Sequence, residues 1–96
     1  MNKPGFVYIV TNRRNGTLYI GVTSNLAQRI WQHREGFVDG FTRKHGLKRL
    51  VWFQDCGSIV QAIVREKQMK TWHRLWKLRV IEEMNPEWND LFDTLV

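Results

Sequence analysis

Two tyrosines and one glycine near the start of the chain are residues whose types and spacing could do chemistry. Residues 6–21 alternate β-branched and aromatic side chains around a turn signal, which predicts a two-stranded hairpin. Because side chains alternate between the two faces of a strand, this hairpin would place Tyr8, Tyr19 and Gly21 on one face. The phenols carry ionisable oxygens, and the glycine leaves space beside them. We therefore expect this face to form the floor of a ligand site.

The expected turn sets that arrangement. Asn15-Gly16 is a dipeptide that readily adopts positive φ, so it predicts a two-residue loop in which Arg14 faces Thr17. The opposite face would then carry aliphatic side chains for a core: Val7, Ile9, Leu18, Ile20 and Val22.

Arg29 and His33 are the next candidates, on an expected helix. Asn25 and Gln28 have the spacing of a capping box, and Gly36 supplies a stop, which predicts a helix of about three turns. Arg29 and His33 lie one turn apart and flank its apolar stripe, so both should lean toward the sheet. Taken alone, such a pair is commonly a surface feature.

Glu66 is a carboxylate on an apolar stripe. Ser58 and Gln61 have the spacing of another helix start, and the following residues place Glu66 on the face of Ala62 and Met69. A carboxylate there costs several kcal/mol unless it is paired or binds a metal. Two explanations stay open: an ion pair with an arginine, which the residue type slightly favours, and a metal ligand.

The remaining pattern completes a domain of mixed class. Residues 36–46 read as a loop with two apolar anchors, Phe37 and Phe41, and a basic tip at residues 43–45. Residues 50–54 are a uniformly apolar third strand, and residues 74–84 are a third helix ended by Asn85-Pro86. The expected fold is α/β, of the α+β type: a three-stranded antiparallel sheet flanked by about three helices in the order β-β-α-β-α-α. Four apolar residues near the third helix are expected in the core: Trp72, Leu75, Trp76 and Val80.

Composition limits the class of protein. The chain has 96 residues, which suits a single domain, and its lone cysteine and three scattered histidines give neither a disulfide nor a zinc motif. No apolar run approaches a membrane span and no leader is visible, so a soluble cytoplasmic protein is expected. The net charge is +6, but residues 1–81 carry fifteen basic and four acidic residues, an excess of eleven. This excess favours a polyanion partner, although solvated helix surfaces explain charge alone equally well.

The ordered residues resemble the GIY-YIG nuclease superfamily. The triplets Phe6-Val7-Tyr8 and Tyr19-Ile20-Gly21, separated by ten residues, are followed by Arg29, His33 and Glu66 on helices. The set covers nearly the whole chain and resembles the small, single-domain members. The first triplet departs from Gly-Ile-Tyr but keeps its tyrosine.

The resemblance implies one nuclease domain over residues 1–96 and hydrolysis of a phosphodiester with one divalent ion, Mg²⁺ or Mn²⁺. Glu66 would hold the metal, Arg29 would stabilise the charge of the transition state, and Tyr19 would accept the proton of the attacking water. Tyr8 and His33 would orient the water or the phosphate. The late asparagine of the superfamily is matched by Asn85, with Asn89 the weaker match, and would steady the Glu66 side of the site.

The expected partner is nucleic acid, with DNA preferred to RNA, no membrane, and a protein partner left open. The residues expected to bind the nucleic acid are Gly21, Arg29, Arg43, Lys44, Lys67 and Lys70. The resulting hypothesis is a metal-dependent endonuclease acting on DNA, with branched or damaged DNA and RNA as further candidates. Two rivals are a nucleic-acid-binding module without catalysis and an adaptor that docks a partner. A carboxylate near a phosphate site argues against both, because without a metal it would repel the anion.

Overall fold

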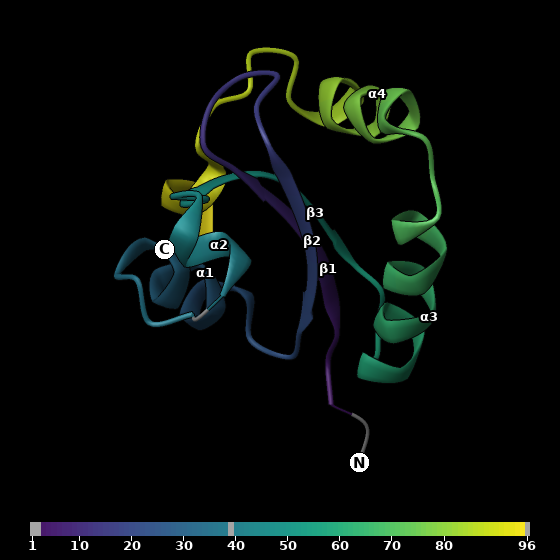
Figure 1. Ribbon diagram of the computed structural model, residues 1–96. Helices are drawn as coiled ribbons and strands as arrows, with labels where there is room; N and C mark the ends of the chain where they lie inside the picture. The colour runs from purple at the N-terminus through teal and green to yellow at the C-terminus, as the bar shows by residue number, and fades with distance from the viewer. Residues whose placement is uncertain (1–2, 39, 96) are drawn as a thin grey trace.

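The computed structural model describes residues 3–38 and 40–95, and its centre is an antiparallel sheet (Figure 1). The strands are β1 (Phe6–Thr11), β2 (Leu18–Thr23) and β3 (Arg49–Asp55), in the spatial order β2-β1-β3. The predicted three-stranded antiparallel sheet is confirmed, and β3 extends one residue beyond the predicted strand at each end. Because β1 is central, β2 has a free edge.

The three predicted helices are confirmed with their predicted starts, but the segment predicted as a loop, residues 36–46, also contains a one-turn helix. The helices are α1 (Leu26–Arg34), α2 (Phe41–Lys44), α3 (Ile59–Lys70) and α4 (Arg74–Met84), followed by the 3₁₀ helix η1 (Leu91–Leu95). Asn25 caps α1 by accepting a hydrogen bond from the backbone N–H of Gln28 at 3.2 Å. Ser58 caps α3 in the same way through the N–H of Gln61, also at 3.2 Å. These bonds satisfy N–H groups that a helix start leaves without partners.

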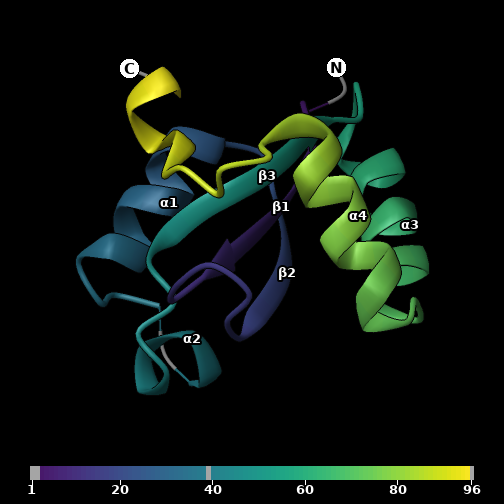
Figure 2. The same cartoon turned by 90° about the horizontal axis from the view of Figure 1, so that it is seen from above.

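The sheet lies between two layers (Figures 1 and 2). α1 and η1 cover one face, and α3 and α4 cover the other. The α1 face buries Tyr8, Val10, Leu26, Ile30, Leu47 and Leu50. The α3 and α4 face buries Val7, Ile9, Ile20, Ala62, Met69 and Ile81, among others. The alternation along β1 therefore sends its even positions to one core and its odd positions to the other.

The hairpin connection differs from the predicted two-residue turn. Thr11 pairs with Leu18, so six residues form the loop. The hydroxyl of Thr11 donates to the carbonyl of Thr17 at 2.7 Å, and the side-chain oxygen of Asn12 accepts from the N–H of Thr17 at 3.1 Å. These side chains close a wider loop than Asn-Gly alone would form. Asn15 takes the positive φ, at 57°. The prediction that Arg14 faces Thr17 was wrong, but the register shift is two residues, so every side chain keeps its predicted face.

Two predictions about burial were also wrong. Phe37 and Phe41 are exposed by 67% and 48%, and the buried residues of that segment are Thr42 and Leu47. Of the four residues expected in the core near α4, Trp72 and Val80 pack against it, whereas Leu75 and Trp76 are exposed by 72% and 53%. The reason is geometric: α2 is a single turn, and α4 buries a narrow stripe at Ile81 against the sheet. Among the described residues, every helix is too short or too polar to cross a membrane.

Candidate active site

The first site residues meet between β1 and α1. The hydroxyl oxygen of Tyr8 lies 2.9 Å from Nε2 of His33, and Nε of Arg29 donates to the same hydroxyl at 3.4 Å. Tyr8 is fully buried and His33 is nearly so. The expectation that Arg29 and His33 lean toward the sheet is confirmed. Tyr8 therefore forms one cluster with two side chains that lie more than twenty residues later in sequence.

The Arg29 hydrogen bond sets the direction of the others. A guanidinium can only donate, so Tyr8 accepts from Arg29, and its own hydroxyl proton is available to donate to a neutral His33. His33 then accepts at Nε2 and carries its proton at Nδ1, which is buried without a partner among the described residues. The chain of donors runs from Arg29 through Tyr8 to a neutral His33.

Burial keeps both Tyr8 and His33 neutral. Burial raises the pKa of Tyr8 to about 12, against the hydrogen bond and charge of Arg29, which lower it; the charges of Tyr19 and Glu66 raise it further. Burial, aided by the charge of Arg29, lowers the pKa of His33 to about 4. At neutral pH the phenol therefore keeps its proton and the imidazole is uncharged.

Gly21 and Tyr19 lie beside this cluster on β2. Gly21 pairs with Tyr8 across the strands, and a Cβ at Gly21 would lie only 2.4 Å from Cζ and the hydroxyl oxygen of Tyr8. Any other residue at position 21 would push the phenol off His33. Tyr19 is half-buried, with its ring centroid 6.0 Å from that of His33. The predicted gap is therefore filled by the Tyr8 ring, and Tyr19 is the more accessible phenol.

Glu66 approaches from the other layer. It lies on α3, which packs against β2 and β1 on the face opposite α1. Its negative charge contributes to the raised pKa of Tyr8. Its partner is Lys70, with Nζ 3.3 Å from Oε1, and the expected pairing with an arginine was wrong. A lysine one helical turn later satisfies the carboxylate locally, without bringing in a distant arginine.

The donor set restricts the kind of metal site. Among the described residues, no group of three or more histidine, cysteine, aspartate or glutamate side chains could hold a metal ion. Magnesium, however, keeps several waters and is often bound through one or two carboxylates together with substrate phosphates. Glu66, with 15% of its side chain exposed, fits such a shared site and not a closed protein cage.

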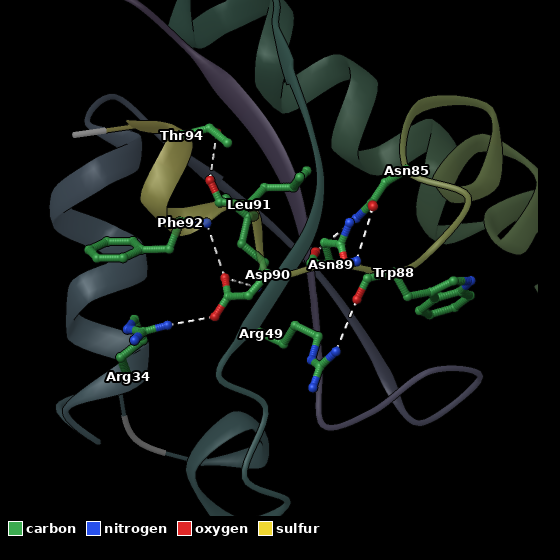
Figure 3. A network of polar contacts seen from close by, with 10 residues as sticks. Arg34, Arg49, Asn85, Trp88, Asn89, Asp90, Leu91, Phe92 and Thr94 are labelled. Carbon is green, nitrogen blue, oxygen red and sulfur yellow. Dashed lines mark hydrogen bonds and ion pairs between the residues drawn. The ribbon is translucent and has the colours of Figure 1, made fainter.

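Asn85 forms a structural joint after α4 (Figure 3). Its amide nitrogen donates to the carbonyls of Val51 at 3.1 Å and Asn89 at 2.8 Å, and its oxygen accepts from the N–H of Asn89 at 3.0 Å. These bonds tie the chain after α4 to β3. They satisfy a buried amide.

The remaining predicted binding residues lie in two places. Arg43 and Lys44 are on α2, near one end of the sheet, whereas Lys67 and Lys70 are on α3, which covers one of its faces (Figure 2). The structure therefore does not gather them into one patch.

One basic cluster was missed by the sequence analysis. A polar hollow of about 480 Å³ is lined by Arg34, Lys48 and Arg49, together with Asp90 and the start of the hairpin loop. In the sequence, the adjacent basic residues Lys48 and Arg49 immediately before a buried strand could have indicated this cluster.

The fold and the site define an α+β domain in which a hairpin tyrosine is joined to a helical histidine and arginine. The family model of the GIY-YIG catalytic domain matches residues 4–79. The chain therefore belongs to the GIY-YIG family, a nuclease family whose members generally use a divalent metal ion.

Its relatives include small bacterial proteins of similar length. A UPF0213 protein of Staphylococcus haemolyticus is 37% identical over 78 residues, 81% of this chain and 94% of that protein. A UPF0213 protein of Bacillus pumilus is 31% identical over 87 residues, 91% of this chain and 89% of that protein. The name UPF0213 states no substrate or activity. No solved structure matches the chain significantly.

Proposed function

We propose that this protein is a metal-dependent endonuclease that hydrolyses phosphodiester bonds in nucleic acid, with DNA preferred to RNA. The observation that carries the proposal is the buried cluster of Arg29, Tyr8 and His33, with the half-buried Tyr19 beside it. Membership of the GIY-YIG family supports the reaction class. The basic excess over residues 1–81 supports a polyanionic substrate.

Accessibility divides the roles of the two phenols. Tyr8 is fully buried, and burial raises its pKa to about 12, so it is a poor acceptor of a proton from water. In our proposal the phenolic oxygen of Tyr19 accepts that proton. Tyr8 and His33 hold the Arg29 guanidinium in place, and Arg29 binds the phosphate and stabilises its added charge. Water attacks phosphorus as the bond to the leaving strand breaks.

Glu66 is the proposed metal-binding residue. It would carry one Mg²⁺ or Mn²⁺ beside β2, the edge strand against which α3 packs. The ion, when bound, neutralises phosphate oxygen and the leaving alkoxide. Lys70 is half-exposed and can turn to solvent or substrate when it leaves Glu66.

The ion pair itself favours a second candidate, a binding module without catalysis. Lys70 already satisfies Glu66 without a metal, as a module that only binds nucleic acid would require. The endonuclease and the binding module predict different effects on cleavage when the Glu66 charge is removed.

Glu66→Gln is therefore the deciding variant. Labelled DNA and RNA of single-stranded, duplex and branched form would be incubated with the protein in magnesium, manganese or EDTA. The endonuclease predicts cleavage that requires the metal and is lost in Glu66→Gln, with binding in EDTA unchanged or tighter because a negative charge is gone. Glu83→Gln, the same change at an exposed position on α4, is the matched control.

The opposite results identify the rival. Metal-independent binding without cleavage of any substrate by the unsubstituted protein would leave the binding module. Cleavage that persists in Glu66→Gln would remove Glu66 from the chemistry. Circular dichroism melting of each variant excludes unfolding as the cause.

A further inference from the structure

We propose that the hollow between the hairpin loop, the end of α1 and the start of β3 binds a backbone phosphate of the nucleic acid, away from the phosphate that is cut. This inference rests on the proposed nucleic-acid function. The hollow has a volume of about 480 Å³, within the range of sites that hold small ligands. Arg34, Lys48 and Arg49 supply its positive charge.

Arg34 is held in position by the C-terminal segment (Figure 3). Its Nη1 lies 2.5 Å from a carboxylate oxygen of Asp90, and its guanidinium lies 4.7 Å from the ring centroid of Phe92. A guanidinium stacked on a ring and held by a carboxylate loses little freedom when it binds a further anion. Its remaining N–H groups stay available as donors.

Asp90 offsets the charge of Arg34 and leaves the charges of Lys48 and Arg49 unpaired by the C-terminal segment. Its carboxylate accepts hydrogen bonds from Arg34 and from the backbone N–H groups of Leu50 at 3.3 Å and Phe92 at 3.0 Å. Those partners satisfy its oxygens. Asp90 therefore acts as a support for Arg34, and the acidic C-terminal segment folds onto the basic surface at this point.

Lys48 and Arg49 supply charge that the tail does not neutralise. Arg49 donates through Nη1 to the carbonyl of Trp88 at 3.0 Å, which fixes its guanidinium and leaves its other N–H groups free for a ligand. Neither Lys48 nor Arg49 forms an ion pair among the described residues, and both are exposed. Glu35, the other acid that lines the hollow, is also exposed, so three basic and two acidic side chains give the lining a net charge of +1.

The position of the hollow connects it to the candidate active site. Thr11 at its wall pairs with Arg49 and follows Val10, which pairs with Tyr19. Two interstrand spacings therefore separate the strand of Tyr19 from that of Arg49, a distance of about 10 Å. A nucleic-acid strand has a phosphate at about every 3.4 Å of duplex rise, so one strand can reach both places. The expected ligand is thus a strand that continues past the site of cleavage and not an isolated phosphate.

The test measures binding in EDTA, where no cleavage can occur. Fluorescence anisotropy of a labelled oligonucleotide, single-stranded and duplex, would be recorded over a range of salt concentrations. Lys48→Gln should bind more weakly, and the negative slope of log K against log salt should become shallower by about 0.7–0.9. In Lys48→Gln/Arg49→Gln the slope should become shallower by about twice as much. Arg79→Gln, an exposed arginine of α4 outside the hollow, should retain the slope.

Each opposite result is informative. An unchanged slope in both Lys48→Gln and the double variant would overturn the inference, and Lys48→Gln decides the matter even if loss of the Arg49 contact unfolds the domain. Equal binding of adenosine 5′-monophosphate and the oligonucleotide would also overturn it, because a free nucleotide would then be the ligand. If the slope becomes shallower in the Lys48 variants but the unsubstituted protein cleaves no substrate, this binding site stands and the endonuclease proposal is refuted.

Discussion

The buried His33 should make the stability of the fold depend on pH in a specific range. Burial and the charge of Arg29 lower the pKa of His33 to about 4, from about 6.5 for an exposed histidine. Between these values the unfolded chain takes up a proton that the folded chain does not. The free energy of unfolding should therefore be fully retained above about pH 6.5 and fall as the pH drops toward 4.

The size of this effect follows from the difference between the two pKa values. Each pKa unit corresponds to about 1.4 kcal/mol, so the full loss below the folded pKa is roughly 3 kcal/mol. Near pH 5, most of the unfolded chains but few of the folded ones carry the proton, and the loss is about 2 kcal/mol. A small domain is stable by only about 5–15 kcal/mol, so this loss is measurable.

Urea unfolding followed by circular dichroism, at about pH 8 and about pH 5, measures the effect. His33→Gln removes the titrating group, so the gap in unfolding free energy between this variant and the unsubstituted protein should shrink by about 2 kcal/mol at the lower pH. His45→Gln, at an exposed position, provides the control. The same pH dependence in His33→Gln and the unsubstituted protein would refute the assignment of His33 as a buried neutral group.

Three substitutions test the rest of the site. Tyr19→Phe removes only the phenolic oxygen, so the cleavage rate in single-turnover assays should fall by about a hundred- to ten-thousandfold while binding is retained. The loss should be larger than in Tyr8→Phe. Equal activity of Tyr19→Phe and the unsubstituted protein would exclude Tyr19 as the base. Gly21→Ala places a Cβ against the Tyr8 ring, so it should lower stability by about 1–3 kcal/mol and reduce cleavage; a normal melting temperature would show that the ring moves aside freely. Asn85→Ala leaves the Val51 carbonyl without its side-chain donor, so it should cost about 1–3 kcal/mol in urea unfolding, whereas a purely catalytic role predicts normal stability.

Local signals predicted most of the fold. The capping residues Asn25 and Ser58 fixed the starts of α1 and α3, because a side-chain oxygen at that position satisfies a free N–H wherever the helix packs. The alternation along residues 6–21 predicted which face each hairpin residue occupies, since that depends on parity alone. The cluster of Tyr8, Arg29 and His33 could be expected for the same reason: each residue sits on the inward side of its own element.

Tertiary contacts decided what the sequence could not. The helical pattern suggests Leu75 and Trp76 as core residues, but α4 buries only a narrow stripe at Ile81 and these two side chains face away from it. The partner of Glu66 depended on rotamers within α3, and a composition rich in arginine gave no reason to choose Lys70. The hollow at Arg34 and Arg49 depends on a C-terminal segment that returns to the start of β3, more than fifty residues after Arg34, and no local pattern encodes that return.

The hairpin loop determines which residue faces Tyr8. With the expected two-residue turn, Val10 would pair with Gly21, and Tyr8 would lie opposite Thr23. The six-residue loop instead pairs Tyr8 with Gly21, the only arrangement of the two in which the missing side chain leaves room for the phenol to reach His33. That loop is held by the Thr11 and Asn12 side chains. The guanidinium of Arg74 adds hydrogen bonds to the loop carbonyls of Asn15 at 2.9 Å and Gly16 at 2.7 Å. Loop geometry at the end of the sheet therefore sets the register that places Tyr8 opposite Gly21, whereas the face of each hairpin side chain would be the same in either register.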